Sequence, residues 1–270
     1  MNIHSSDTVV DIVINSDCLT YMKSIADNVI DLVVTSPPYA KQRASTYGGI
    51  NAKDFPEWFI TISKELHRIL KPTGSFVLNI KEHARNGTRH PYVLKTVLQL
   101  SELFIWNDTY IWNKSNPFPT GNKRRLKDGF EYCYLFTKTL KYKFFPDNVL
   151  VPSISKNLKY EKQRNNKSRI DMKNNSGMNM HRRYASDFVR PSNVLTLATD
   201  NTSHKHPATF PIGLPEFFIK LLTEPEDVVY DPFMGSGTTL LAAKNLNRHF
   251  IGTDIFNEYV LDAKQRLALS

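Results

Sequence analysis

The chain has 270 residues, of which 41% are hydrophobic, and a formal net charge of +9. This length and apolar content indicate a globular protein with one large core and room for one insertion. No apolar run approaches membrane-spanning length, and residues 1–7 lack the basic and apolar regions of a signal peptide, so we expect a cytoplasmic protein that does not bind a membrane. Cys18 and Cys133 lack close spacing, which predicts reduced thiols rather than a disulfide framework or a zinc site, and we expect no metal.

Short β-branched runs alternate with helical patterns along most of the chain, which is typical of an α/β fold with a wound, mostly parallel sheet. Seven strands are predicted, at Val9–Ile14, Ile30–Val34, Ser75–Ile80, Phe104–Trp112, Glu131–Thr137, Asp227–Asp231 and His249–Thr253. Apolar residues recur at helical spacing from Trp58 to Leu70 and predict a helix that ends at Lys71. A polar, Pro-rich link without a helix joins the fourth and fifth strands, so we expect these two to pair antiparallel.

A basic, Asn-rich segment then interrupts the alternation, which resumes with a predicted helix over 215–222. Residues 151–195 contain ten Lys and Arg against three acidic residues, an excess of seven positive charges. Such a segment is typical of a docking surface for nucleic acid, and it is equally compatible with a solvated insertion. We predict one sheet domain in two halves, 1–144 and 201–270, with an insertion over 145–200.

The pentad Thr35-Ser36-Pro37-Pro38-Tyr39 directly follows the predicted buried strand at Ile30–Val34. Neither proline has a backbone N–H, so the carbonyls of this turn have no ladder to complete and can point into a cleft. Carbonyls that face a cleft can bind an amino group. Taken alone, the pentad is also compatible with a rigid turn that has only an architectural role.

A second motif follows the sixth predicted strand, where Asp231-Pro232-Phe233-Met234-Gly235-Ser236-Gly237-Thr238 forms a Gly-rich turn before a helix start. Glycine lets a ligand approach the backbone because it has no side chain and tolerates positive φ. The turn departs from the dinucleotide fingerprint, since Leu240 stands where the third Gly would be, and no phosphate-loop Gly-Lys-Ser/Thr follows. Pyrophosphate is therefore not the expected ligand.

Asp254 ends the next predicted strand, where a carboxylate can accept hydrogen bonds from both ribose hydroxyls of an adenosine. The alternative for Asp254 is a helix cap, because residues 255–267 have a helical pattern. Asp231 is acidic and Phe233 is bulky, which suits a cationic sulfonium better than a phosphate. These features together fit S-adenosyl-L-methionine.

The two motifs together resemble the amino-group DNA methyltransferases of bacterial restriction-modification systems. The catalytic motif precedes the cofactor motif, which is the permuted order of that family's beta class. Further matches are Asn15-Ser16-Asp17-Cys18-Leu19, the stretch Glu65–Gly74 and His206-Pro207-Ala208-Thr209-Phe210-Pro211. Ser16 is a departure, because the family often has Gly there. The resemblance covers nearly everything outside the basic segment, and it implies the methyltransferase fold with 145–200 as the target-recognition region.

The resemblance implies a cofactor site for S-adenosyl-L-methionine and a catalytic turn. Its cofactor residues would be Asp17, Cys18, Thr35, His206, Pro207, Asp231, Phe233, Gly235, Ser236, Gly237, Thr238 and Asp254. The catalytic residues would be Ser36, Pro37, Pro38 and Tyr39. For Cys18, a buried turn residue remains the alternative.

The implied substrate is double-stranded DNA, with the target base flipped out of the helix into the cleft. Predicted DNA-binding residues are Lys41, Arg43, Lys156, Lys159, Arg164, Lys167, Arg169, Arg182 and Arg183. Residues 41–47 are also compatible with a solvated loop. A separate restriction endonuclease is an expected companion, and we expect a monomer or a homodimer.

Ser36 decides the predicted base, because Ser is commoner among the family's cytosine-N4 members and Asp among its adenine-N6 members. The stretch from Arg43 to Gly49 also resembles the cytosine-N4 subset. We therefore predict cytosine-N4 methylation, with adenine-N6 methylation as the alternative. Two further alternatives are a methyltransferase of RNA or protein amides, which usually has the reverse motif order, and a catalytically inactive DNA-binding subunit.

Overall fold

The computed structural model describes residues 2–3, 9–39, 50–82, 84–85, 88–117, 124–153, 187–199 and 210–269. The chain divides into two compact units, Met1–Phe145 with Ser192–Ser270, and Pro146–Pro191. In the smaller unit, the 3₁₀ helix η1 (Pro146–Val149) precedes a short antiparallel pair, β10 (Val151–Pro152) with β11 (Phe188–Val189). An ion pair of 3.3 Å joins Arg190 to Asp147 within this unit.

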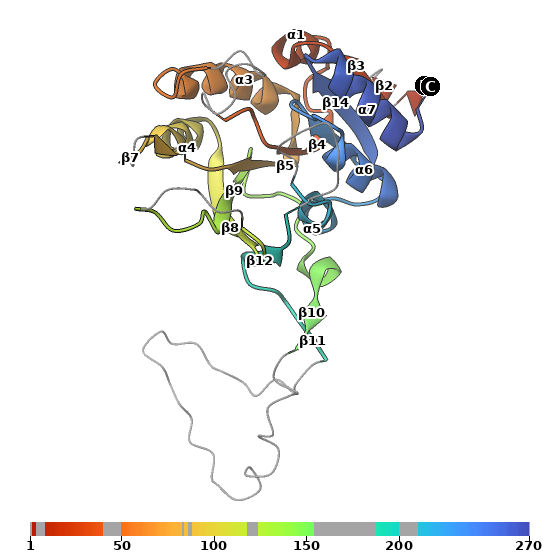
Figure 1. Ribbon diagram of the computed structural model, residues 1–270. Coiled ribbons are helices and arrows are strands. Elements are labelled where there is room, and N and C mark those ends of the chain that lie inside the picture. Colours follow the sequence, from red (N-terminus) through yellow and green to blue (C-terminus); the bar gives the residue numbers. More distant parts are fainter. Residues whose placement is uncertain are drawn as a thin grey trace, which may run out of the picture. The chain divides into compact units, whose positions relative to one another are not determined.

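Eight of the described strands form one sheet in the larger unit, in the order β12-β8-β9-β5-β4-β13-β14-β3 (Figure 1). The strands are β3 (Ile12–Asn15), β4 (Ile30–Thr35), β5 (Leu70–Ile80), β8 (Ile105–Lys114), β9 (Phe130–Thr137), β12 (Val194–Leu197), β13 (Val228–Asp231) and β14 (His249–Asp254). Neighbours are parallel except that β9 runs antiparallel to both β5 and β8. The predicted wound, mostly parallel sheet is confirmed, and so is the antiparallel pairing of the fourth and fifth predicted strands.

The sheet has eight strands rather than the predicted seven. The additional strand, β12, pairs in parallel with β8 at the sheet edge and lies inside the range 145–200 that we predicted as an insertion. It is only four residues long and only Leu195 in it is buried, so it lacks the apolar run that marks an inner strand. The first predicted strand is also divided, because Asp11 has φ of 60° between β2 (Val9–Val10) and β3.

Short antiparallel pairs accompany the sheet, namely β1 (Asn2–Ile3) with β2, and β6 (Ala84–Arg85) with β7 (Thr88–Arg89). The helix predicted to end at Lys71 in fact ends earlier. Helix α3 stops at Ile69, and β5 begins at Leu70, which pairs with Ile30 of β4. The chain therefore begins to pair with β4 at Leu70, two residues before the Pro72-Thr73-Gly74 sequence from which we predicted the end of the helix.

Helices cover both faces of the sheet (Figure 1). On one face α1 (Cys18–Met22), α3 (Phe55–Ile69) and α4 (Tyr92–Leu103) contact one another in series, and on the other α5 (Gly213–Leu222), α6 (Thr238–Asn245) and α7 (Asn257–Leu267) do so. Pro56 lies in the first turn of α3, where backbone N–H groups have no partner within the helix, so the missing N–H of proline costs no hydrogen bond. The helix buries an apolar stripe against the sheet.

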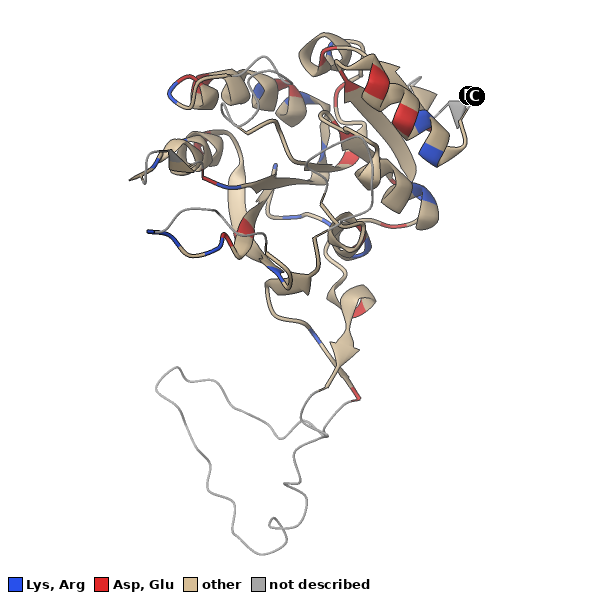
Figure 2. Ribbon diagram, viewed as in Figure 1, with Lys and Arg blue, Asp and Glu red and all other residues tan. Residues whose placement is uncertain are grey.

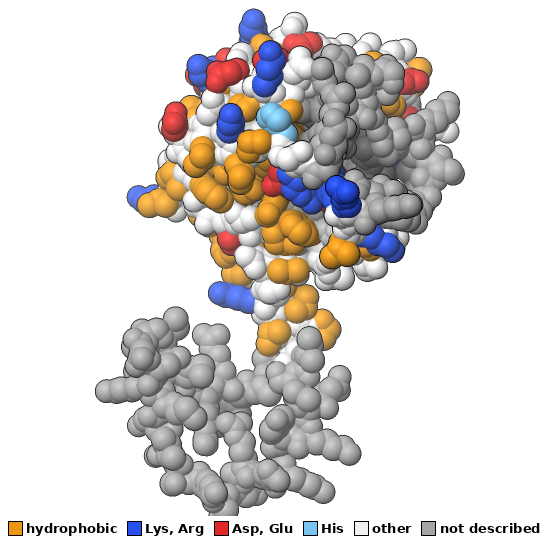
Figure 3. Space-filling model, turned by 60° about the vertical axis from the view of Figure 1, so that its left-hand side comes forward, with side chains coloured by type: hydrophobic (Ala, Val, Ile, Leu, Met, Phe, Trp, Pro, Cys, Tyr) orange, Lys and Arg blue, Asp and Glu red, His pale blue; other side chains and the backbone are white. Residues whose placement is uncertain are grey.

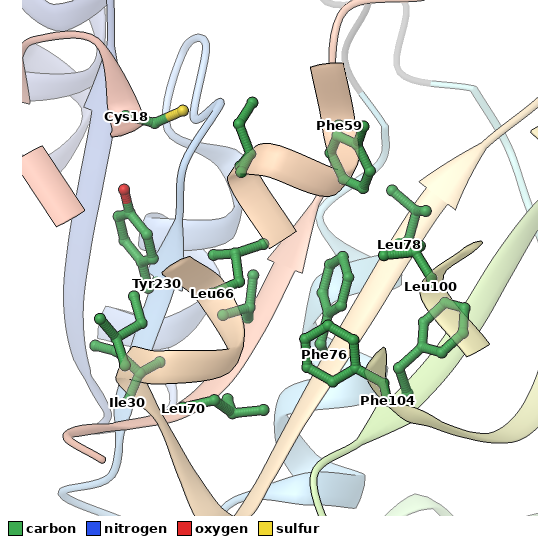
Figure 4. Packing of buried hydrophobic residues seen from close by; sticks show 14 of the residues in the cluster. Cys18, Ile30, Phe59, Leu66, Leu70, Phe76, Leu78, Leu100, Phe104 and Tyr230 are labelled. Atoms are coloured by element: carbon green, nitrogen blue, oxygen red, sulfur yellow. The ribbon is translucent and has the colours of Figure 1, made fainter. Parts of the chain in front are cut away.

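Aromatic side chains fill the core between α3, α4 and the sheet. Phe76 of β5 lies between Phe59 of α3 and Phe104, with ring centroids 6.4 and 5.6 Å away (Figure 4). Burying each such side chain stabilises the fold by about 1.5–3 kcal/mol. Strand β4 is buried along its whole length, as expected for a central parallel strand. This packing fixes the point at which the chain leaves the sheet after Thr35.

Among the described residues, no helix is both long and apolar enough to cross a membrane. Hydrophobic side chains gather on the face drawn in Figure 3, and α4 exposes 55% of Leu94 and 62% of Leu98.

Figure 2 shows basic residues on the segment that leads into β9, which contains Arg124, Arg125 and Lys127. This segment lies at the edge of the sheet where the neighbouring parallel strands end, because β9 runs antiparallel to them.

Candidate active site

Both predicted motifs meet at the point where the winding of the sheet reverses. From β4 the chain passes through α3 to β5 on one side, whereas from β13 it passes through α6 to β14 on the other. Strands β4 and β13 pair in parallel, so the turns that follow them leave the same edge side by side. Crevices at such reversal points, beyond the carboxyl ends of the strands, are where open α/β sheets bind ligands.

Asp231 connects the two motifs. It ends β13, is 1% exposed, and accepts hydrogen bonds from the Thr35 hydroxyl at 2.6 Å, the Thr239 hydroxyl at 2.7 Å and the Phe233 N–H at 3.0 Å. Burial raises the pKa of Asp231 to about 6, although these donors favour the ionised form. The carboxylate thus holds the end of β4, the Gly-rich turn and the start of α6 together.

The Gly-rich turn has the backbone that its sequence predicts. Gly235 and Gly237 have φ of 52° and 77°, in the left-handed region that favours glycine. The Gly235 N–H donates to the Asp254 carboxylate at 3.1 Å, and the Phe233 ring lies 5.7 Å from the ring of Trp58. Asp254 therefore shapes the turn from the neighbouring strand, β14.

Arg266 also holds this turn, and our sequence reasoning missed it. Its guanidinium, on α7, donates to the Ser236 hydroxyl at 2.9 Å, the Ser236 carbonyl at 2.7 Å and the Thr238 hydroxyl at 3.3 Å. A basic residue in the last turn of a helix is ordinarily solvent-exposed and interacts favourably with the helix dipole. The sequence therefore gave no sign that Arg266 bonds to the Gly-rich turn. Ser236 and Thr238, predicted as cofactor residues, contact α7 through their hydroxyl groups.

The segment that contains the predicted cofactor residues Asp17 and Cys18 lies next to Asp254. The Ser16 N–H donates to the Asp254 carbonyl at 3.0 Å, which joins the end of β3 to the end of β14. Asp17 caps helix α1 by accepting from the Thr20 N–H at 2.9 Å. Cys18 is buried, and burial raises the pKa of its thiol to about 12, so it is neutral near pH 7. A neutral thiol suits packing rather than nucleophilic chemistry.

The Ser-Pro-Pro-Tyr turn leaves β4 at the same edge of the sheet as the Gly-rich turn. Pro37 is buried, while Ser36, Pro38 and Tyr39 are half-buried. The Tyr39 hydroxyl donates to the Glu131 carboxylate at 2.6 Å, and the Ser36 hydroxyl lies 3.4 Å from the Tyr39 oxygen. The turn therefore has a polar anchor on β9 that the sequence analysis did not identify.

Several predicted site residues lie outside the described residues. They are His206, Pro207, Lys41, Arg43, Lys156, Lys159, Arg164, Lys167, Arg169, Arg182 and Arg183. Within the described ranges, no group of three or more His, Cys, Asp and Glu is arranged to hold a metal ion.

The residues at this edge fit S-adenosyl-L-methionine. The Asp254 carboxylate accepts the Gly235 N–H at one oxygen and the Phe256 N–H at the other, and a carboxylate has enough lone pairs to accept a ribose hydroxyl as well. The left-handed backbone at Gly235 and Gly237 brings the turn close to this carboxylate. Asp254 would hold the ribose of this cofactor, and Phe233 with the Gly-rich turn would hold its sulfonium side.

Comparison with known proteins identifies the family. A sequence profile described as DNA methylase matches residues 30–265. The chain belongs to this DNA methylase family. This methyltransferase is 32% identical to the Type II methyltransferase M.PvuII of Proteus hauseri over 268 residues, which cover 90% of this chain and 80% of that relative. It is 31% identical to M.BglII of Bacillus subtilis over 256 residues, covering 94% of this chain and 68% of that relative.

Solved structures agree with this assignment. The structure of the PvuII DNA methyltransferase (cytosine-N4-specific) matches with a TM-score of 0.74 and 28% identity, covering 96% of this chain and 86% of that chain. A putative DNA modification methylase from Thermus thermophilus, complexed with S-adenosyl-L-methionine, matches in fold with a TM-score of 0.63 at 22% identity, over 95% of this chain and 94% of that chain. The protein is an S-adenosylmethionine-dependent DNA methyltransferase of restriction-modification type.

Proposed function

We propose that this methyltransferase modifies the exocyclic N4 of cytosine in duplex DNA. The observation that carries the proposal is the hydroxyl of Ser36 at the end of β4, beside the turn anchored by Asp231. The similarity to an enzyme named as cytosine-N4-specific supports it. Names of Type II methyltransferases among the relatives support the expectation of a separate restriction endonuclease.

An exocyclic amino nitrogen is a poor nucleophile, because its lone pair is delocalised into the ring. In the proposed reaction the Ser36 hydroxyl oxygen and the Pro37 carbonyl accept the two amino hydrogens, which localises that lone pair and stabilises the positive charge that develops on nitrogen. S-adenosyl-L-methionine supplies an electrophilic methyl group when bound. Most of the rate gain then comes from holding the two reactants in line.

Tyr39 contributes a ring face to the proposed base site, since its hydroxyl is already used by Glu131. A base within a duplex cannot reach this crevice, so the target cytosine is proposed to flip out, at a cost of a few kcal/mol. Contacts of Lys and Arg with phosphates offset that cost. The segment 145–200 is the proposed target-recognition region, with Lys41 and Arg43 close to the flipped base.

One experiment tests the proposal. The protein is incubated with S-adenosyl-L-methionine carrying a labelled methyl group and with plasmid DNA, and the DNA is digested to nucleosides. We expect the label on N4-methylcytosine. Label on N6-methyladenine would overturn the cytosine assignment, and absence of label from DNA would contradict the whole proposal.

A further inference from the structure

Glu131 is a buried carboxylate beside the catalytic turn. It lies at the start of β9, opposite Trp112 of β8, and it is 5% exposed. Its Oε1 atom lies 2.6 Å from the Lys114 ammonium and 3.5 Å from that of Lys81, while its Oε2 atom accepts from the Tyr39 hydroxyl at 2.6 Å. A buried charge is costly unless it is paired and hydrogen-bonded, and these groups supply both.

Three separate segments create this arrangement. Lys81 follows the end of β5, Lys114 ends β8, and Glu131 begins the antiparallel strand between them. All three therefore reach the same edge of the sheet as the turn after β4. Glu131 forms ion pairs with both ammonium groups, and a carboxylate in an ion pair is only a hydrogen-bond acceptor.

The charge of Glu131 fixes the direction of the neighbouring hydrogen bonds. The Tyr39 hydroxyl must donate to the carboxylate, so its oxygen is left to accept from the Ser36 hydroxyl, 3.4 Å away. Burial and the neighbouring Glu131 carboxylate raise the pKa of Tyr39 well above its ordinary value, which keeps this proton in place. The second link is long, as hydrogen bonds in catalytic sites often are before substrate binds.

We propose that Glu131 is a positioning residue for methyl transfer, which acts through Tyr39 to turn the Ser36 hydroxyl proton away from the substrate. With its one proton directed at Tyr39, Ser36 presents only lone pairs to the target amino group. The inference rests on the proposed role of Ser36 as the acceptor of an amino hydrogen. Without Glu131, the hydroxyls of Tyr39 and Ser36 lose their fixed direction.

A double-mutant cycle tests this coupling. Single-turnover rates of methyl transfer to plasmid DNA are measured at saturating cofactor and DNA for the wild type, Glu131→Gln, Tyr39→Phe and the double variant. Each single change is expected to slow transfer about tenfold, the loss of one hydrogen bond to a charged group. The double variant is expected to be no slower than Tyr39→Phe, because Glu131 then has nothing to act through. The affinity for S-adenosyl-L-methionine is expected to stay unchanged.

Asp31→Asn is the matched control. Asp31 is also a buried carboxylate paired with a lysine, Lys71 at 2.7 Å, but it lies near the other end of β4. Its substitution is expected to lower the melting temperature without changing the transfer rate. Glu131→Asp keeps the charge but moves it away from Tyr39. If Glu131→Gln fails to fold, Glu131→Asp takes its place in the double-mutant cycle.

Two results would overturn the inference: an unchanged rate in Glu131→Gln, or rate losses of Glu131 and Tyr39 variants that multiply. An unchanged rate would mean that Glu131 serves stability alone, and losses that multiply would mean that Glu131 affects the rate by a route other than Tyr39. The identity of the methylated nucleoside is read separately from the same digests. Label on adenine would therefore contradict the cytosine proposal while the coupling measurement stands, and the two proposals can fail independently.

Discussion

The Thr35 hydroxyl donates a 2.6 Å hydrogen bond to the buried Asp231 carboxylate, and this bond joins two motifs that lie 196 residues apart in the chain. Thr35 precedes the Ser-Pro-Pro-Tyr turn and Asp231 precedes the Gly-rich turn. The bond therefore fixes the methyl-acceptor side of the site relative to the cofactor side, independently of the order of the motifs in the sequence.

Removing this bond is expected to destabilise the fold. Thr35→Val keeps the side-chain shape but removes one of the two donors to Oδ1 of the buried Asp231 carboxylate, which keeps only the Phe233 N–H, so the free energy of unfolding should fall by about 1–3 kcal/mol. Urea unfolding measures the change. Thr61→Val is the control, because the Thr61 hydroxyl is exposed and bonds only within α3, to the Glu57 carbonyl. Equal losses in the two variants would contradict a special role for the Thr35 bond.

The ionisation of Asp231 predicts a pH dependence of stability. Burial raises its pKa from 3.8 to about 6, so the folded state binds this proton more tightly than the unfolded state. As pH rises from about 4 to about 6, ionisation lowers the free energy of unfolding. Asp231→Asn lacks this ionisation. The stability of the wild type minus that of the variant should therefore fall across this range and level off above it.

Urea unfolding of both proteins in half-unit steps of pH checks this sign. Taking the difference between the two proteins cancels the titration of groups that they share. A difference that rises with pH over the same range would mean that the hydrogen bonds of Asp231 outweigh its burial.

The left-handed backbone at Gly237 predicts a selective effect of alanine. With φ of 77°, a Cβ at Gly237 would also lie 3.0 Å from the Cβ of Ala263. Gly237→Ala should lower the free energy of unfolding by about 1–2 kcal/mol and weaken binding of S-adenosyl-L-methionine, measured by calorimetry. A Cβ at Gly129 meets nothing within 4 Å, so Gly129→Ala should leave both quantities near wild type. Unchanged affinity in Gly237→Ala would separate the turn from cofactor binding.

Loss of the proposed Ser36 acceptor should slow chemistry without affecting cofactor binding. Ser36→Ala is expected to lower the single-turnover rate by about a hundredfold or more, as when one preorganised charge-stabilising group is lost. Ser36→Thr keeps the hydroxyl and should retain more of the rate. A Ser36→Ala rate equal to wild type would refute the proposed mechanism.

The basic segment predicts a salt-dependent affinity for DNA. If Arg182 and Arg183 each contact a phosphate, replacing both with Gln should reduce the slope of log K against log salt by about 1.8, or about 0.9 for each contact. Filter binding at several salt concentrations measures the slope. Lys64→Gln is the control, since Lys64 is exposed on the second half of α3, away from the turn after β4. An unchanged slope in the double variant would exclude these two residues as phosphate contacts.

Most of the scaffold of the site was predictable because it depends on local patterns. Apolar runs predicted the inner strands, and the parallel arrangement implied that the turns after Thr35 and Asp231 leave the same edge. Strand β12 was missed because four residues in a polar segment carry no periodic signal. Glu131 was read only as the start of a strand.

The polar anchors of the site were not predictable, because they depend on residues that meet only in the folded chain. Glu131 is paired in the core with Lys81, which follows β5, and with Lys114, which ends β8, and no local pattern around Glu131 predicts either partner. Arg266 reads as an ordinary basic residue of an amphipathic helix, yet it bonds to Ser236 across 30 residues. Long-range pairings of this kind have no signature in local composition.

The pairing of β4 with β13 also determines when the protein can fold during its synthesis. Strand β4 leaves the ribosome early, but β13, which covers one of its edges, begins only at Val228. Until then the apolar β4 has an unpaired edge that other chains can join. Contacts of such long sequence separation also form slowly. A chain that ends before Val228 would lose the central pairing of its sheet, so premature termination should give aggregates rather than a shorter working enzyme.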